Sequence, residues 1–509
     1  MKPVKFGMLG VGTTLALLLA HSVAAAPANS HRTDLSQKDQ IRVLSVTRPT
    51  NDFQNAETFE ENSAGAATDT ARPSSNAFSQ SSANLDFEGQ RTFKLGNGLF
   101  RKIWVSSPSS TQASDGLGPL FNARSCQRCH LKDGRGHPPE NASDHATSMF
   151  LRLSVPPKTE QEKADIATGR KALIPEPTYG GQLQDFAVSG LKAEGKMVIQ
   201  YTEVPVELGD GTVVSLRKPV YSVTDLGFGD LSNDVLLSPR IAPQMIGLGL
   251  LEAIHPMDIK SQADPEDHDG DGISGRFSEV FDPESEEKKL GLFGWKASTP
   301  TVLLQSANAF AGDMGISSPM APRHHGDCTA NQPDCLNLPT GVQSRLGDTE
   351  APDPVLELVA FYARNLAVPK RRNVNDTKAL KGKEIFYSAG CTACHTPKYV
   401  TRRDAPQKEL RFQLIWPYTD MLLHDMGPGL SDQRPVGSSS GSEWRTAPLW
   451  GIGLTETVNG HTFFLHDGRA RNLLEAVLWH GGEAQSSRDA VVGLDQENRE
   501  ALLFFLNSL

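Results

Sequence analysis

Two copies of one cysteine and histidine pattern occur in the sequence, at residues 126–130 and 391–395. Each reads Cys-x-x-Cys-His, the pattern to which haem is attached covalently in c-type cytochromes. Two thiols one helical turn apart can add to the two vinyl groups of a haem, and the adjacent histidine can bind the iron. A reactive dithiol or a zinc site would leave the repeated histidines unexplained. We therefore expect two covalently bound haems, held by Cys126, Cys129, His130, Cys391, Cys394 and His395.

A second group of candidate ligands is acidic. Asp267, Asp269 and Asp271 alternate along the chain ahead of a glycine, as in the first half of a calcium-binding EF-hand loop. A complete loop carries a glutamate at its twelfth position, where this chain has Ser278, with Glu279 one residue later. The pattern predicts a calcium site without the full helix-loop-helix geometry, and a solvated acidic turn is the alternative.

Only Cys328 and Cys335 lie outside the two haem motifs. An oxidising compartment would favour a disulfide between two cysteines so close in sequence. A reactive thiol pair is the alternative, but the two lack the Cys-x-x-Cys spacing that tunes thiol acidity. We expect a structural disulfide that closes the intervening loop.

The elements that must position the two haem motifs also repeat. Residues 354–366 and 497–509 both place apolar side chains at helical spacing, and both finish on Asn and Leu. Each follows one Cys-x-x-Cys-His motif, which favours two cytochrome c-like units in tandem. Chance similarity between two amphipathic helices is the alternative. A further helix at 380–387 is predicted to deliver Cys391.

The two predicted units differ in size. The first spans residues 87–370 and contains a long insertion, at about 153–352, whereas the second spans residues 371–509. Within the insertion we expect β-strands at 196–201 and 212–216 and a helix at 242–254. The predicted fold class is mainly α: two tandem cytochrome c-like units, the first with an insertion that contains some β structure.

The N-terminus resembles an export signal. Lys2 and Lys5 precede an apolar run at 7–20 and small residues that end at Ala26, so residues 1–26 are predicted to be a cleaved signal peptide for export to the periplasm. An uncleaved anchor is the alternative, although a membrane span needs about 20 apolar residues. Residues 27–86 are polar and predict a flexible lead-in. The 50 Lys and Arg against 60 Asp and Glu give a net charge of −10, which argues against nucleic-acid binding.

Four stretches, at residues 120–126, 248–254, 293–297 and 464–470, match segments of a known family. From residue 87 to 509 the chain resembles the bacterial di-haem oxidoreductase family, which is related to the di-haem cytochrome c peroxidases. The resemblance implies a peroxidase-like enzyme. Electrons from a small donor protein, such as a cytochrome or a cupredoxin, would enter at the C-terminal haem, and hydrogen peroxide would be reduced at the N-terminal haem. A non-catalytic electron carrier and a di-haem enzyme that oxidises a partner protein are the alternatives.

The resemblance suggests a sixth iron ligand for the C-terminal haem. Residues 474–482 are similar to the peroxidase segment that supplies a methionine to the haem where electrons enter, and His480 occupies that place. Two histidine ligands would lower the haem potential relative to a histidine and a methionine. His480 could instead cap the helix expected at 473–479. The competing ligands are His424 and Met426, whereas the resemblance implies that His466 lines the same haem pocket without binding the iron.

The N-terminal haem has no single predicted distal ligand. His145 is spaced from His130 like the displaceable distal histidine of the peroxidases. Glu252 matches an acidic residue of the family and could move the proton needed to break the O–O bond, or it could be a buried partner of Arg240. Trp295, Trp450 and Trp479 are candidates for a place between the haems. Other possible ligands are His137, Met149, Met314, His324 and His325.

Overall fold

The structure is a computed structural model that describes residues 1, 31–141, 144 and 147–509. The predicted signal peptide at 1–26 and the predicted distal ligand His145 lie outside the described residues. None of the described helices combines the length and apolar character that crossing a lipid bilayer requires.

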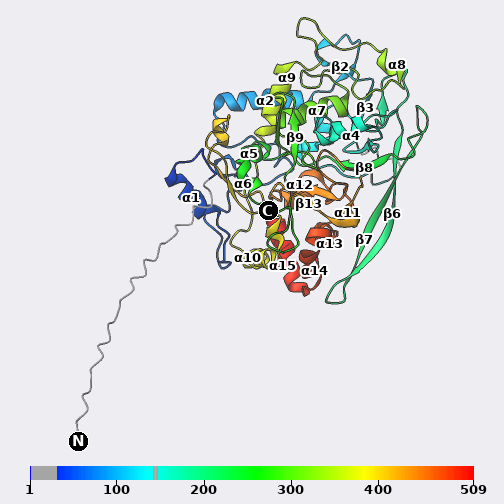
Figure 1. The fold of residues 1–509 in the computed structure, drawn as a ribbon. Helices are drawn as coiled ribbons and strands as arrows, with labels where there is room; N and C mark the ends of the chain where they lie inside the picture. Colours follow the sequence, from blue (N-terminus) through cyan, green and yellow to red (C-terminus); the bar gives the residue numbers. More distant parts are fainter. Residues whose placement is uncertain (2–30, 142–143, 145–146) are drawn as a thin grey trace.

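Helices and small sheets together build the fold (Figure 1). The prediction of a mainly α fold is correct only in part, because 31% of the structure is helical and 17% is strand. Every sheet among the described residues has two strands. The helices are α1 (Gln37–Thr47), α2 (Phe87–Arg101), α3 (Cys126–Cys129), α4 (Glu160–Ala167), α5 (Leu248–Glu252), α6 (Pro256–Lys260), α7 (Val302–Met314), α8 (Pro333–Leu336), α9 (Asp353–Arg364), α10 (Thr377–Ser388), α11 (Gly427–Leu430), α12 (Thr455–Asn459), α13 (Leu473–Leu478), α14 (Gln485–Val492) and α15 (Gln496–Ser508).

The strands pair as antiparallel ladders, apart from the parallel pair β1 and β2. They are β1 (Val105–Ser106), β2 (Asp115–Leu117), β3 (Leu120–Phe121), β4 (Met149–Ser154), β5 (Phe186–Ala187), β6 (Lys196–Glu207), β7 (Val213–Thr224), β8 (Leu236–Ile241), β9 (Glu279–Asp282), β10 (Glu287–Leu290), β11 (Tyr399–Val400), β12 (Leu414–Ile415), β13 (Leu423–Asp425) and β14 (Glu443–Arg445).

Each haem motif follows a helix that crosses a later helix at a glycine. A Cβ on Gly96 of α2 would lie 2.2 Å from the Leu358 carbonyl oxygen of α9. A Cβ on Gly382 of α10 would lie 2.0 Å from the Ala501 carbonyl oxygen of α15. Only glycine allows such close backbone contact. The helices predicted at 354–366, 380–387 and 497–509 are confirmed as α9, α10 and α15. The crossing of α2 with α9 and the crossing of α10 with α15 have the same kind of close contact.

Aromatic side chains repeat at the same two crossings. Phe100 packs on Tyr362 with ring centroids 5.1 Å apart, and Phe386 packs on Phe505 at 5.2 Å. The centroids of these phenylalanine rings lie 6.3 Å from the His130 ring and 6.2 Å from the His395 ring, respectively. Each helix pair thus fixes one wall beside a motif histidine.

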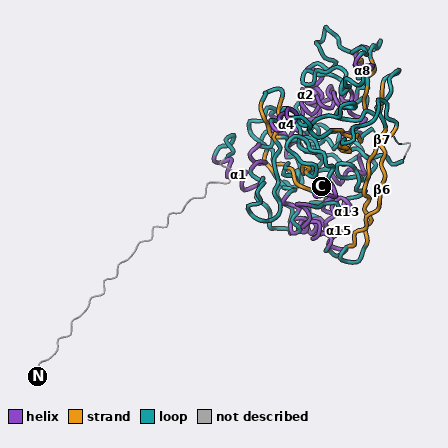
Figure 2. The backbone as a smooth tube through the Cα atoms, turned by 45° about the vertical axis from the view of Figure 1, so that its right-hand side comes forward, coloured by secondary structure: helices purple, strands orange, loops and turns teal. Residues whose placement is uncertain are grey.

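The predicted strands of the insertion form one long hairpin. β6 and β7 pair from Lys196 with Thr224 to Glu207 with Val213, and the hairpin lies along one edge of the molecule (Figures 1 and 2). Its tip reaches the C-terminal part of the chain, where Leu208 and Leu216 join the core around α15. The insertion therefore helps to enclose residues that follow the second haem motif.

Residues 31–86 are packed against the rest of the chain, so the prediction of a flexible lead-in is wrong for this part. Phe78 is fully buried, and Glu60 forms ion pairs with Arg371 and with the Lys383 ammonium, which lies 2.8 Å away. The polar composition suggested disorder because it does not reveal these partners, which lie about 300 residues further along the chain.

The predicted helix at 242–254 is much shorter in the structure, where only α5 (Leu248–Glu252) is helical. Gly247 has a positive φ of 71°, and a Cβ there would lie 2.3 Å from the Trp450 ring. Pro243 lacks an N–H to donate within a helix. The residues before α5 therefore run as a loop, which leaves the Pro243 carbonyl free for another partner.

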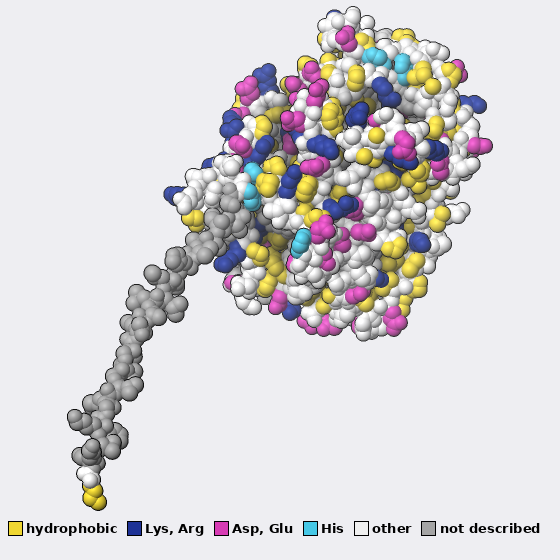
Figure 3. All heavy atoms as spheres, in the orientation of Figure 1, with side chains coloured by type: hydrophobic (Ala, Val, Ile, Leu, Met, Phe, Trp, Pro, Cys, Tyr) yellow, Lys and Arg dark blue, Asp and Glu magenta, His cyan; other side chains and the backbone are white. Residues whose placement is uncertain are grey.

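Charged side chains are spread over the visible face of the molecule. Lysine, arginine, aspartate and glutamate are interspersed there, without one continuous basic patch (Figure 3). With this distribution, and with a net charge of −10, that face has no preference for a polyanion such as a nucleic acid.

Candidate haem sites

Each Cys-x-x-Cys-His motif forms a single helical turn. The His130 N–H donates to the Cys126 carbonyl at 3.0 Å, and the His395 N–H donates to the Cys391 carbonyl at 2.9 Å. Burial raises the pKa of the Cys126 and Cys391 thiols to about 12. Such thiols are poor redox dithiols, because the thiolate is the reactive form. The two turns are therefore better suited to covalent attachment of a group than to disulfide exchange.

The two motif histidines have the same environment. The Nδ1 of His130 hydrogen-bonds the Pro243 carbonyl at 2.8 Å, and the Nδ1 of His395 hydrogen-bonds the Tyr418 carbonyl at 2.9 Å. This bond fixes the tautomer and leaves Nε2 as the free donor atom for a metal. Burial lowers the pKa of both histidines to about 4, so both are neutral at physiological pH. Both side chains therefore fit a haem iron.

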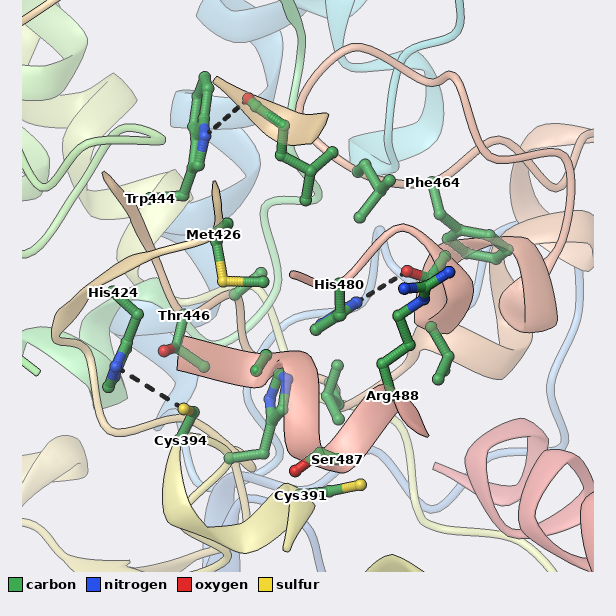
Figure 4. A pocket seen from close by; sticks show the side chains of 18 of the residues that line it. Cys391, Cys394, His424, Met426, Trp444, Thr446, Phe464, His480, Ser487 and Arg488 are labelled. Carbon is green, nitrogen blue, oxygen red and sulfur yellow. Dashed lines mark hydrogen bonds between the residues drawn. The ribbon is translucent and has the colours of Figure 1, made fainter. Parts of the chain in front are cut away.

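The cavity beside His395 is predominantly apolar and contains a second neutral histidine. His480 lines this cavity together with Cys391, Cys394 and His395 (Figure 4). Its Nδ1 donates to the Ala476 carbonyl at 2.7 Å, and burial lowers its pKa. Its Nε2 is therefore the ring nitrogen available to a metal. His480 is thus a second histidine, besides His395, of the kind that haem iron binds.

The other candidate ligands of this cavity have different environments. His424 is held on both ring nitrogens, with Nε2 2.7 Å from Asp420 and Nδ1 2.6 Å from Glu483. These carboxylates raise its pKa well above the ordinary value, so it is a cation without a free lone pair. Met426 lines the cavity and remains an alternative to His480.

His466 is buried and stacked flat on Trp444, with ring centroids 3.7 Å apart. Burial lowers its pKa to about 3, and its Nε2 has no hydrogen-bond partner among the described residues. Trp444 cannot be identified from sequence alone, because a single tryptophan has no spacing pattern. The stacking fixes the orientation of His466 on the wall of the cavity.

The cavity beside His130 is larger and more polar. Its volume is about 480 Å³, against about 190 Å³ for the cavity beside His395. His130 is the only histidine among the described residues that lines it, and of the other predicted ligands that the structure describes only Met314 does. His137, His324 and His325 bond elsewhere, to the Pro138 carbonyl, Glu350 and the Leu338 carbonyl. The described residues thus present one histidine here and four in the other cavity, three of them neutral.

The predicted acid Glu252 is held in an ion pair. Its carboxylate receives the Arg364 Nε at 2.5 Å and the Val302 N–H at 2.9 Å, and it does not line the cavity. Arg240, the partner considered from sequence, instead pairs with Asp432 at 3.1 Å. The structure offers another buried carboxyl that does line the cavity, Asp313, whose pKa is raised by burial.

Four residues line both cavities, and one of them is Trp295. Its indole N–H donates to the Ile241 carbonyl at 2.9 Å, which fixes the ring. Trp450 packs near Gly247, and Trp479 packs under Arg469. The structure therefore ranks Trp295 first among the three tryptophans for a position between the two sites. The other shared residues are Arg135, Arg445 and Ala447.

The three aspartates of the acidic loop bring their carboxylates together, as a cation site requires. Ligand oxygens of Asp267, Asp269 and Asp271 lie within 4.8 Å of one another. The loop continues into Ser274, whose hydroxyl donates to Glu483 at 2.7 Å. The cation site thus stays a prediction with suitable geometry, and it connects to the carboxylate that holds His424.

Cys328 and Cys335 form the predicted disulfide.

Two one-turn Cys-x-x-Cys-His motifs, each with a neutral histidine that faces its own cavity, define a di-haem protein. The chain belongs to the family described as "Di-haem oxidoreductase, putative peroxidase", whose model matches residues 58–509. Part of it is similar to a chain of the structure titled "Kuenenia stuttgartiensis Hydrazine Synthase Pressurized with 20 bar Xenon", with 19% identity and a TM-score of 0.21. That match covers 31% of this chain and 56% of the other. No curated protein matches.

Proposed function

We propose that this chain is an exported di-haem c-type oxidoreductase that reduces hydrogen peroxide in the periplasm. The observation that carries the proposal is the asymmetry between the cavities: among the described residues, three neutral histidines, His395, His466 and His480, line the one beside His395, whereas His130 alone lines the other. A haem with two protein ligands transfers electrons, whereas a haem with an open side can bind a small oxidant. Electrons would therefore enter at the C-terminal haem and reach the substrate at the N-terminal haem.

The residues of this chain have distinct tasks in the proposal. When bound, the haems would supply iron centres that accept and store single electrons. His130 and His395 hold the irons, and their bonds to backbone carbonyls keep both rings in place. Asp313 is protonated more readily than an ordinary carboxyl, because burial raises its pKa. It is thus suited to hold the proton that peroxide reduction consumes.

The location, the partner and the overall architecture belong to the same proposal. The signal-like residues 1–26 would direct the chain to the periplasm. A small cytochrome or cupredoxin would donate the electrons, and no nucleic acid would bind. The matching helix crossings at Gly96 and Gly382 support two cytochrome c-like units in tandem. The free Nε2 atoms beside the paired thiols support covalent attachment of both haems.

Electron paramagnetic resonance of the haem-loaded protein tests the proposal. The spectrum should contain one low-spin haem and one high-spin haem, and added peroxide should change the high-spin signal in the fully oxidised or the half-reduced protein. We expect these two spin states because the cavity beside His395 contains further neutral histidines that can bind the iron, whereas His130 is the only described histidine that lines the other cavity. Two low-spin haems that stay unreactive in both redox states would make the chain an electron carrier instead.

Calcium should bind at the acidic loop and stabilise the protein. The three carboxylates converge there, and oxygen ligands at this spacing suit calcium. At a hundredfold excess over the dissociation constant, binding would add about 2.7 kcal/mol to the free energy of unfolding. Thermal unfolding with and without a chelator measures this, with Asp269→Asn as the weakened variant. Glu266→Gln, outside the cluster, is the control. Calorimetry without saturable calcium binding would contradict the prediction.

A further inference from the structure

The wall of the cavity beside His130 carries an excess of cations. Two of its arginines lie on the paired strands β4 and β8, where Arg152 is opposite Ser238 and Arg240 is opposite Phe150. A third, Arg434, comes from the C-terminal part of the chain and donates to the Leu153 carbonyl at 3.1 Å. The carboxylates that line the cavity are Asp313 and Asp327, whereas the cations are Arg135, Arg152, Arg240, Lys296, Arg434 and Arg445.

The nearby carboxylates are already engaged. Asp432 pairs with Arg240 at 3.1 Å and with Lys296 at 3.3 Å. The Asp313 carboxylate is 3.6 Å from Arg152. Asp327 pairs with an exposed arginine and accepts the Gly181 N–H. No carboxylate of the described residues therefore remains for Arg434.

Arg434 is nevertheless almost completely buried, with 3% of its surface exposed. It has no ion pair among the described residues, and its Nε has no hydrogen-bond partner there. Burial and the like charges of Arg240 and Arg152 lower its pKa to about 9. A buried unpaired cation is costly, and an anion bound between these guanidinium groups would remove the cost.

We propose that Arg434, together with Arg152 and Arg240, forms an anion-binding subsite of the first cavity for a carboxylate or a small oxyanion. Guanidinium groups bind such planar or tetrahedral anions through paired hydrogen bonds. This inference rests on the proposed function in one respect: the cavity must be the one that holds the N-terminal haem. The anion has two possible sources, a propionate group of that haem or a free anionic substrate, and both have the same chemistry.

The test uses the haem-loaded full chain, with acetate as the probe anion at constant ionic strength. Arg434→Gln keeps the approximate length of the side chain and removes its charge. Arg72→Gln, at an exposed arginine, is the matched control. Two quantities are measured in each protein: acetate affinity by calorimetry and the potential of the N-terminal haem by spectroelectrochemistry.

If the subsite takes a free anion, acetate binds the unmodified protein saturably, and Arg434→Gln weakens binding by roughly tenfold to a hundredfold, as expected for the loss of a charge-assisted hydrogen bond. If it takes a propionate, acetate does not bind, and Arg434→Gln lowers the haem potential because a cation beside the haem is lost. Either result supports the subsite, and Arg72→Gln should reproduce neither.

A haem-loaded Arg434→Gln protein that matches the unmodified protein in both measurements would overturn the subsite. If that variant does not fold, Arg152→Gln replaces it, because the Arg152 side chain is 34% exposed and tolerates change more readily. The peroxide response of the unmodified protein is recorded in parallel. If Arg434→Gln loses acetate binding while the unmodified protein responds to peroxide, the result bears on the subsite alone. If the unmodified protein binds acetate but does not respond to peroxide, the result rejects the proposed function alone.

Discussion

Replacing His480 with alanine should convert the C-terminal haem from a low-spin to a high-spin centre. The structure places the His480 ring in the same cavity as His395, with Nδ1 bonded to the Ala476 carbonyl and Nε2 left for iron. Alanine has no donor atom, so water or an open position would take its place. Absorption and electron paramagnetic resonance spectra of the oxidised protein measure the change, which should involve the whole population of that haem.

Three variants control this experiment. His480→Met should stay low-spin, and its haem potential should rise. Axial ligands set haem potentials over a range of roughly 0.8 V, and the rise should be a fraction of that range. His466→Ala should stay low-spin, because the His466 ring is stacked on Trp444 and is not the iron ligand in this proposal. If His480→Ala stays low-spin while Met426→Leu becomes high-spin, the ligand is Met426 instead.

Replacing His424 with leucine should destabilise the protein by about 3–5 kcal/mol, the loss seen when one partner of a buried ion pair is removed. His424 is a buried cation held between Asp420 and Glu483, whose side chains are 1% and 11% exposed. Leucine would leave both carboxylates without their countercharge. Urea unfolding of the haem-loaded protein measures the change. A triple variant that adds Asp420→Asn and Glu483→Gln to His424→Leu should recover most of the stability. If the triple variant is as unstable as His424→Leu, the lost stability comes from packing and not from the ion pairs.

The pH dependence of this effect has a definite sign. The pKa of His424 is raised above its ordinary 6.5, so its contribution is complete below 6.5 and is lost as the pH rises through the raised pKa. The pKa of Glu483 is lowered from 4.5 to about 2, so its contribution is present above 4.5 and is lost as the pH falls toward 2. The stability difference between the unmodified protein and His424→Leu should therefore be largest from about pH 5 to 6.5. A difference that keeps growing at alkaline pH would contradict this assignment.

The parts of the fold that could be predicted are those with local periodicity. The helices at 354–366 and 497–509, the helix that delivers Cys391, and the hairpin of the insertion all have repeating apolar positions within one short segment. The segment before residue 87 has no such pattern. It is ordered by Glu60 and its partners far along the chain, and composition carries no information on such contacts.

The site was predictable to the same extent. The Cys-x-x-Cys-His motifs and the acidic loop have fixed spacing, which sequence reveals directly. Asp313 and Arg434 are single residues whose significance comes from burial and from neighbours more than 100 positions away, such as Gln182 for Asp313. Trp444 is likewise a single residue, and its significance comes from its stacking on the buried His466. The carbonyl that holds His130 was also hidden, because residues 242–247 had been predicted as helix, where carbonyls bond internally.

The two proximal carbonyls differ in their distance along the chain from the histidines they hold. Tyr418 is 23 residues after His395, whereas Pro243 is 113 residues after His130. Closing the longer loop costs about 1.4 kcal/mol more in chain entropy. We expect the C-terminal site to form early in folding and the N-terminal site only after much of the insertion is in place. In a refolding time course, amide protection around residue 395 should precede protection around residue 130, and the reverse order would refute the expectation. We thus expect the site proposed for substrate to mature after the site proposed for electron entry.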